Sequence, residues 1–188
     1  MNMHLGSMHA ASFATDPKHL GFVLARYKFV AKMLVDRAHV LEVGCGDGTG
    51  ANVVRSHVGR LEGIDIERGQ DIIERPYGDD GDPWDAVYAL DVLEHIAPEH
   101  EFRALSNMRK HLVPYGICII GMPSLESQTY ASTLSKQHHV NCKTEAELRA
   151  SMDRHFHAVL MFGMNDETLH TGFGPMCHYR LAIGVGPR

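Results

Sequence analysis

The sequence has little of what marks secreted, membrane-spanning or polyanion-binding proteins. Its cysteines are few, at Cys45, Cys118, Cys142 and Cys177. They form no C-x-x-C pair and no signal peptide precedes them, which indicates a reduced, cytoplasmic protein. No apolar run approaches the roughly 20 residues of a membrane-spanning helix. The net charge of −5 argues against nucleic acid as the main partner, because proteins that bind phosphate backbones usually carry a basic face.

Metal-binding spacings are also scarce, although the chain holds 14 histidines. Histidine and cysteine come close together at 138–142 and at 177–178, and neither group has the spacing of a zinc site. The Glu94-His95 pair lacks the second histidine of a zincin helix. The sequence therefore predicts no metal site.

Length and composition fit one globular domain. The chain has 188 residues, of which 44% are hydrophobic and 22% charged, enough to bury a core. Residues 1–15 resemble a flexible leader, and 16–188 are predicted to form a single domain. Asp16-Pro17 predicts a helix start, and apolar residues at helical spacing continue to about Arg37.

The segment 40–50, V-L-E-V-G-C-G-D-G-T-G, is the centre of the chain's organisation. An apolar run followed by glycines predicts a buried parallel strand, a tight turn and a helix start. Glycines at 44, 46 and 48 allow positive φ and close approach of the backbone to a ligand. The dinucleotide fingerprint would need glycine in place of Thr49, and no Gly-Lys-Ser/Thr follows, so neither that fingerprint nor a P-loop fits.

The pattern that does fit is E-x-G-x-G-x-G, starting at Glu42, and it resembles the first motif of the class I S-adenosylmethionine-dependent methyltransferases. A second stretch, W-D-A-V-Y-A-L-D-V-L-E-H-I at 84–96, resembles the same family. The resemblance spans about 40–148. It implies an α/β fold with a Rossmann-like, doubly wound, mostly parallel sheet, a C-terminal antiparallel hairpin, and S-adenosylmethionine as cofactor.

The end of the chain fits this fold. The segments 157–163 and 179–185 read as the two strands of the hairpin. Their connection, 164–175, is unusually polar. We expect a solvated loop there, with a substrate-facing role as the alternative.

The stretch after the second strand departs from the family. Only residues 66–70 separate Asp65 from Asp71, whereas a parallel crossover needs a dozen or more residues. We therefore expect the third strand and the helix before it to be shortened or absent.

The resemblance also implies the cofactor site. Asp65 corresponds to an acid whose carboxylate can accept hydrogen bonds from both ribose hydroxyls. Asp71 corresponds to an acid that contacts the adenine amino group, and the backbone near 89–91 would face the methionine part. The cofactor-binding residues implied are Glu42, Gly44, Cys45, Gly46, Asp65, Ile66, Asp71, Ile72, Leu90, Asp91 and His95.

Residues 139–148 resemble a stretch that lines the acceptor pocket in O-methyltransferases of the ubiquinone-pathway type. We therefore predict His139 as the catalytic residue, an imidazole able to receive the proton of an acceptor hydroxyl. Thr144 and Glu147 have the spacing of a capping box for the helix that follows.

The sequence thus predicts methyl transfer to a small molecule, preferably to a hydroxyl of a sugar or natural-product metabolite, by a monomer or homodimer. Three alternatives stay open. An N-methyltransferase could act on a small amine or amino sugar. The short 65–71 segment allows a non-catalytic S-adenosylmethionine-binding protein. An NAD(P)-dependent oxidoreductase is the alternative from another enzyme class. Neither nucleic acid nor a membrane is expected as a partner.

Overall fold

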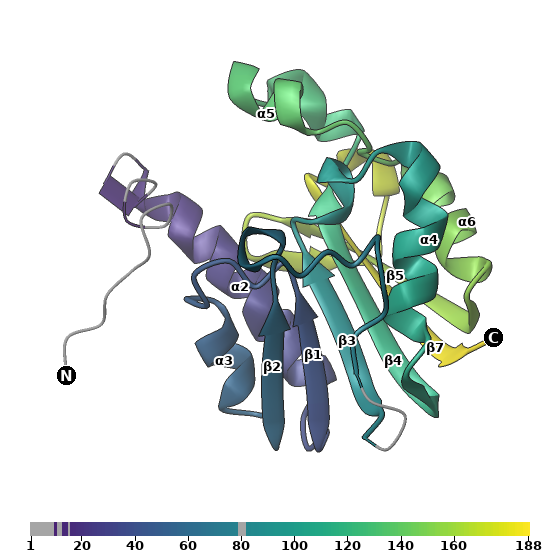
Figure 1. Cartoon of the computed structure of the whole chain (residues 1–188). Helices are drawn as coiled ribbons and strands as arrows, with labels where there is room; N and C mark the ends of the chain where they lie inside the picture. Colours follow the sequence, from purple (N-terminus) through teal and green to yellow (C-terminus); the bar gives the residue numbers. More distant parts are fainter. Residues whose placement is uncertain (1–9, 11–12, 15, 79–81) are drawn as a thin grey trace.

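The computed structural model describes residues 10, 13–14, 16–78 and 82–188 (Figure 1). The predicted flexible leader, 1–15, lies almost wholly outside the described residues.

A seven-stranded sheet with the order β2-β1-β3-β4-β7-β5-β6 runs through the molecule (Figure 1). Strands β2, β1, β3 and β4 are parallel, whereas β7, β5 and β6 add antiparallel pairs. The strands are β1 (His39–Val43), β2 (Arg60–Ile64), β3 (Trp84–Leu90), β4 (Leu112–Pro123), β5 (Phe156–Asn165), β6 (Thr168–His170) and β7 (Tyr179–Pro187). The predicted α/β fold, with a mostly parallel core and antiparallel C-terminal strands, is confirmed.

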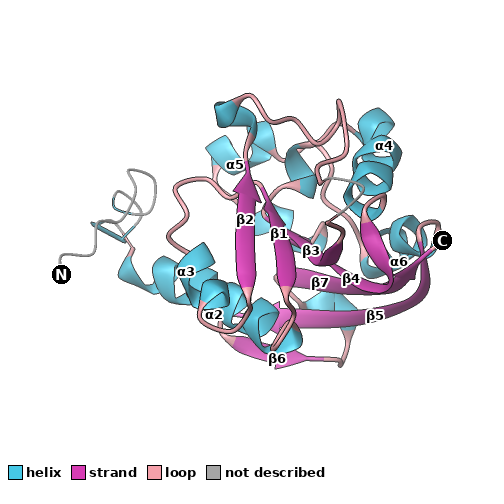
Figure 2. Cartoon of the chain, turned by 60° about the horizontal axis from the view of Figure 1, so that its bottom comes forward, coloured by secondary structure: helices cyan, strands magenta, loops and turns pink. Residues whose placement is uncertain are grey.

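Helices cover both faces of the sheet (Figures 1 and 2). The α-helices are α2 (Pro17–Met33), α3 (Ala51–Arg55), α4 (Pro98–Arg109), α5 (Thr133–His138) and α6 (Glu145–Asp153). Short 3₁₀ turns are η1 (Ile66–Arg68), η2 (Leu93–His95), η3 (Glu126–Tyr130) and η4 (Gly174–Met176). Alternate strand residues face two cores, because successive side chains of a strand point to opposite sides. Leu41 and Val87 pack with α4 and α6, whereas Val40 and Tyr88 pack with α2 and α3.

Two predicted helix starts are confirmed. The side chain of Asp16 accepts a hydrogen bond from the Lys18 N–H at 3.1 Å, and Pro17 opens α2. A complete capping box of Thr144 and Glu147 begins α6. The predicted end of α2 near Arg37 was wrong, because the chain leaves helical geometry after Met33 and reaches φ +62° at Asp36.

The expectation of a solvated loop at 164–175 was also wrong in part. Asp166 adopts φ +52° and turns the chain directly after β5. The turn lets Thr168–His170 pair with the end of β5 as the edge strand β6. An aspartate tolerates this left-handed conformation better than most residues, which favours a tight turn there. The two strands predicted as a hairpin, β5 and β7, do pair antiparallel, with β6 between them in sequence.

In its described residues, the short connection after β2 lacks the helix and the third strand of the family, as predicted. Within the described part of 65–83 there is no α-helix and no further strand, only η1 and turns, so β2 forms the edge of the sheet. We call residues 65–78 the strap. Ile72 of the strap is buried in the core. From α4, the side-chain amide of Asn107 donates to the carbonyls of Ile72 and Ile73 at 2.7 and 3.2 Å, and Arg103 donates to the carbonyl of Glu74 at 3.1 Å.

Candidate functional site

The glycine turn lies at the carboxyl end of β1, the edge where open α/β sheets bind ligands. Gly44, Gly46 and Gly48 have φ values of +75°, +48° and +78°. A Cβ atom on Gly44 would lie 2.3 Å from the Val92 side chain. By contrast, no atom lies within 4 Å of the Cβ position of Gly46 or Gly48. The turn therefore presents bare backbone to open space, which a ligand can fill.

Asp65 lies against this turn. One carboxylate oxygen accepts the Gly46 N–H at 2.8 Å, and the other accepts the Glu67 N–H at 2.9 Å. Because an ionised carboxylate has about four lone-pair sites, each oxygen keeps capacity for another donor. The next side chain, Ile66, is 69% exposed, although it is large and apolar. This part of the strap can offer both polar and apolar contacts.

Residues 71–73 of the strap are more enclosed than Ile66. Asp71 Oδ1 accepts the Ile73 N–H at 2.8 Å and so closes a local turn. The Ile72 side chain packs into the core rather than facing open space. The adenine-side roles of Asp71 and Ile72 stay predictions.

Glu42 is a buried carboxylate inside β1, next to the turn. The hydroxyls of Tyr27 from α2 and Tyr88 from β3 lie beside it. Burial raises the pKa of Glu42 to about 7, and the two tyrosines oppose this rise. Its Oε2 atom has no hydrogen-bond partner among the described residues. In the turn itself, burial raises the pKa of the Cys45 thiol, so Cys45 is not an activated nucleophile.

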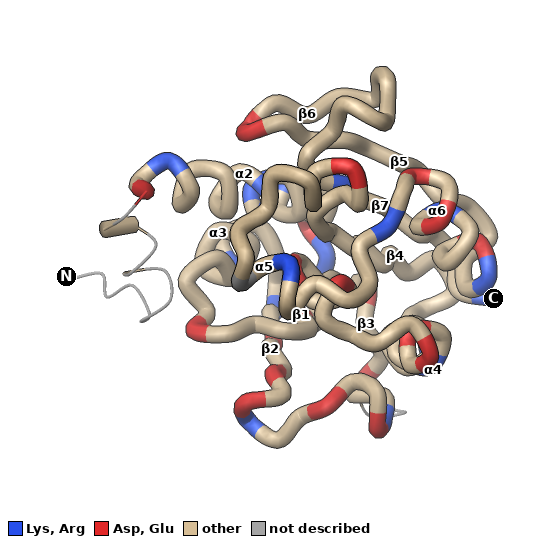
Figure 3. Tube along the Cα trace, turned by 90° about the horizontal axis from the view of Figure 1, so that it is seen from above, with Lys and Arg blue, Asp and Glu red and all other residues tan. Residues whose placement is uncertain are grey.

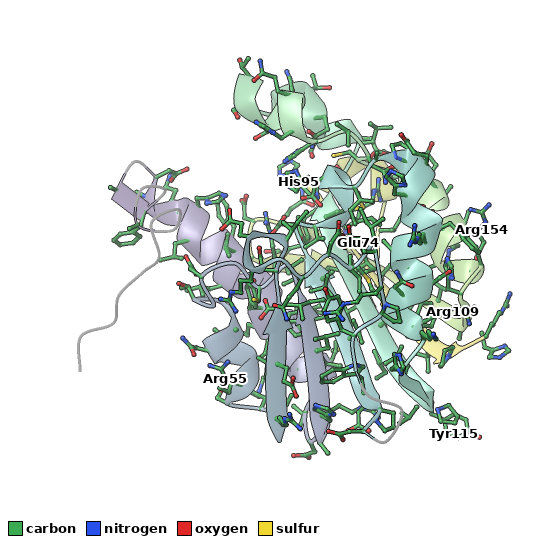
Figure 4. The ribbon with its side chains drawn as sticks, in the orientation of Figure 1. Arg55, Glu74, His95, Arg109, Tyr115 and Arg154 are labelled. Atoms are coloured by element: carbon green, nitrogen blue, oxygen red, sulfur yellow. The ribbon has the colours of Figure 1, made fainter. Side chains whose placement is uncertain are left out.

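A cavity of about 680 Å³ adjoins the ends of β3 and β4. Four predicted site residues line it, namely Leu90, Asp91, His95 and His139. Figure 4 shows His95 between the strand ends and the α5 segment. The volume falls within the roughly 300–1,000 Å³ of small-molecule sites.

Sequence reasoning missed the partner of Asp91. Asp91 turns the chain at φ +57°, and its N–H donates to the Gly121 carbonyl at 2.9 Å. Arg26 of α2 places Nη1 3.0 Å from both carboxylate oxygens, with its guanidinium 3.8 Å from the centre of the Tyr179 ring. The apolar spacing of a helix identifies its core face but does not indicate which strand end a polar side chain will meet. Arg26 fixes the Asp91 carboxylate at the cavity wall.

Three side chains with metal-ligand chemistry meet in the cavity. One atom each from Glu94, His95 and His139 lies within 4.8 Å of the other two, and the two imidazole rings are 5.1 Å apart. Glu94 is 1% exposed, and neither carboxylate oxygen has a hydrogen-bond partner among the described residues. Burial raises the pKa of Glu94 well above its ordinary value, and the charge of Asp91 adds to this rise. The local spacings could not predict this cluster, because His139 reaches it from a distant segment.

Both histidines have the same ring nitrogen engaged. His95 Nδ1 lies 3.1 Å from the carbonyl oxygen of His138, and His139 Nδ1 lies 3.0 Å from Oε1 of Gln128. Since a carbonyl oxygen only accepts, Nδ1 carries the proton in each neutral ring and Nε2 keeps a free lone pair. Burial and the neighbouring His95 lower the pKa of His139, which favours its neutral form.

The molecule as a whole carries charged residues of both signs. Seen from above, basic and acidic positions are interspersed along the trace (Figure 3). No helix in the described part of the chain is long and apolar enough to cross a membrane.

Comparison with known proteins connects this geometry to a family. The sequence matches the family model of a methyltransferase domain over residues 18–159. No curated protein matches the sequence.

Solved structures share the fold at low sequence identity. An S-adenosylmethionine-dependent methyltransferase from Archaeoglobus fulgidus is 18% identical, with a TM-score of 0.70 over 95% of this chain and 99% of that one. The N-methyltransferase NodS from Bradyrhizobium japonicum WM9, in complex with S-adenosylhomocysteine, is 17% identical, with a TM-score of 0.60 over 90% of this chain and 87% of that one. The small RNA methyltransferase HEN1 is 15% identical, with a TM-score of 0.67 over 86% of this chain but 25% of that one.

Proposed function

Because the chain belongs to the class I S-adenosylmethionine-dependent methyltransferases, we propose that it methylates a hydroxyl group of a small molecule. The observation that carries the proposal is the 680 Å³ cavity lined by Asp91, His95 and His139. It lies near the bare turn, because Gly44 of the turn packs against Val92, the residue after Asp91. The turn suits a nucleoside cofactor, and the cavity suits an acceptor of modest size.

The residues around the turn fit S-adenosylmethionine, which supplies a methyl group made electrophilic by its sulfonium. The open space beside Gly46 accepts a ligand where a Cβ would intrude. Asp65 keeps lone pairs for the ribose hydroxyls. The partnerless Oε2 of Glu42 can accept an N–H group. These roles for Gly46, Asp65 and Glu42 are part of the proposal.

Placement would be the main contribution of the cavity. Holding the acceptor oxygen in line with the bond that breaks can supply roughly 7–11 kcal/mol of the barrier. His139 lines the cavity, and its Nε2, which keeps a lone pair while Nδ1 is engaged with Gln128, can take the hydroxyl proton as the new oxygen–carbon bond forms. A positioned base of this kind typically adds about 10²–10⁴-fold in rate.

A small amine is the second candidate acceptor. The observation that favours it is Glu94, whose buried carboxylate has no partner among the described residues and could accept N–H donors. The interspersed charges of Figure 3 and the net charge of −5 support a small molecule over nucleic acid.

Two measurements test the proposal. Calorimetric titration should show binding of S-adenosylmethionine and S-adenosylhomocysteine and none of NAD; preferential NAD binding would overturn the cofactor assignment. Release of S-adenosylhomocysteine is then followed with matched pairs of acceptors that differ only in a hydroxyl or an amine. Turnover limited to the hydroxyl members supports the proposal. Turnover limited to the amines, or cofactor binding without turnover across the panel, contradicts it.

A further inference from the structure

We propose that Glu94, His95 and His139 form a binding site for a divalent cation of the first transition row. The inference rests on the proposed function, because the cation would hold the acceptor oxygen inside the same cavity. It also changes the role of His139 from proton acceptor to metal ligand.

The donor set is the first argument. Two imidazole nitrogens and one carboxylate oxygen, all within 4.8 Å of one another, can converge on one ion. Catalytic metal sites commonly use three protein ligands of these types and leave positions open for water or substrate. Here the open positions would face the cavity that His95 and His139 line.

The orientation of the rings is the second argument. A metal-bound histidine almost always donates its other ring N–H to a carbonyl or carboxylate. His95 does so to the backbone carbonyl of His138, and His139 does so to the side-chain oxygen of Gln128. Both rings are therefore held in the tautomer that leaves Nε2 free as a ligand.

The third argument is the state of Glu94. A carboxylate that is 1% exposed normally needs hydrogen bonds or a counter-charge, because burying it alone is costly. Neither oxygen of Glu94 has a hydrogen-bond partner among the described residues. The guanidinium of Arg26 is engaged with the Asp91 carboxylate and makes no hydrogen bond to Glu94. A cation between Glu94 and the two imidazoles would supply the missing partner.

The cation would act as a Lewis acid. Coordination of the acceptor hydroxyl lowers its pKa, so the oxygen can attack while its proton passes to solvent water. The oxygen–carbon bond then forms as the sulfur–carbon bond breaks, without oxidation or reduction. Imidazole ligands favour Co²⁺, Zn²⁺ or Fe²⁺ over Mg²⁺, which prefers oxygen ligands.

The test uses the full-length chain after treatment with a chelator. Co²⁺ is added while the visible absorption and the heat of binding are recorded. The wild type should bind one equivalent of Co²⁺ with a visible band from the bound ion, and bind Mg²⁺ more weakly. Glu94→Gln and His139→Ala should weaken Co²⁺ binding by about tenfold or more, and Gln128→Ala by about 10–100-fold. His157→Ala, which changes an exposed histidine on β5, should bind like the wild type.

Titration of every variant with S-adenosylhomocysteine separates this inference from the proposed function. Normal nucleoside binding without a Co²⁺ site in the wild type overturns the cation site and leaves the methyltransferase proposal intact. Equal Co²⁺ affinity in the wild type, Glu94→Gln and His139→Ala also overturns it. A Co²⁺ site that depends on these residues, in a chain that binds no S-adenosylhomocysteine, supports the cation site and contradicts the proposed function.

Discussion

At the scale of single residues, we predict that cofactor binding depends on the missing side chain of Gly46. Gly46→Val would place methyl groups in the open space beside the turn. We expect S-adenosylhomocysteine to bind about 100-fold more weakly, which is about 3 kcal/mol. Calorimetric titration of the variant measures this loss.

Gly186→Val is the matched control. Gly186 also has positive φ, at +68°, but lies near the end of β7 beside Pro114 rather than at the turn. Backbone strain should be similar in the two variants, so both should lose stability. Equal loss of nucleoside binding in Gly186→Val would mean that strain, not exclusion of the ligand, explains the Gly46 result.

The site was predictable where one short segment determines the geometry. The glycine spacing placed the turn, and the strand that ends at Ile64 placed Asp65 beside it. Arg26 and Gln128 were not predictable, because each meets its partner only after distant elements pack. The same holds for the cluster of Glu94, His95 and His139, whose members were visible singly but whose proximity depends on the folded chain.

At the scale of elements, the capping box of α6 makes a measurable contribution to stability. Thr144 Oγ1 and the Glu147 carboxylate satisfy backbone N–H groups that would otherwise lack partners at the helix start. Thr144→Ala should lower the free energy of unfolding by about 1 kcal/mol. Glu147→Gln should change it by less than about 0.5 kcal/mol, because glutamine serves the same position in a capping box. Urea denaturation of both variants checks the ranking, and a reversed order would contradict it.

Element types were more predictable than their limits. Asp16-Pro17 and Thr144-Glu147 begin helices through contacts within a few residues of one another, so the sequence alone predicts them. Both helix starts lie where predicted. The end of α2 and the strand β6 depend instead on left-handed backbone at Asp36 and Asp166. Aspartate permits that conformation without requiring it, so the sequence alone left both features undetermined.

At the scale of the whole molecule, two buried groups give stability opposite pH dependences. Burial raises the pKa of Glu42 from 4.5 to about 7, so its contribution is full below pH 4.5 and is lost as pH rises through 7. Burial and the nearby Arg109 and Arg154 lower the pKa of His155 from 6.5 to about 4. The contribution of His155 is therefore full above pH 6.5 and is lost as pH falls toward 4. Between pH 4.5 and 6.5 the two effects offset each other.

Single variants should separate these effects. Relative to the wild type, Glu42→Gln should gain up to about 3 kcal/mol in free energy of unfolding between pH 4.5 and 7, since one pH unit is about 1.4 kcal/mol. His155→Phe, which keeps an aromatic ring beside Phe102, should gain stability relative to the wild type as pH falls from 6.5 to 4. Urea denaturation across this range measures both differences. Flat differences would mean that neither group titrates abnormally in the folded chain.

The conformation of the strap between β2 and β3 can influence the affinity of the chain for its nucleoside cofactor. Asn107 and Arg103 of α4 supply hydrogen bonds to its carbonyls, so its conformation is set partly from outside. A substitution on that helix can therefore shift Asp71 and Ile72, the residues predicted to face the adenine, without touching the bound molecule. Affinity could therefore be adjusted remotely, by changes in a helix that holds no ligand, while the glycine turn stays unaltered.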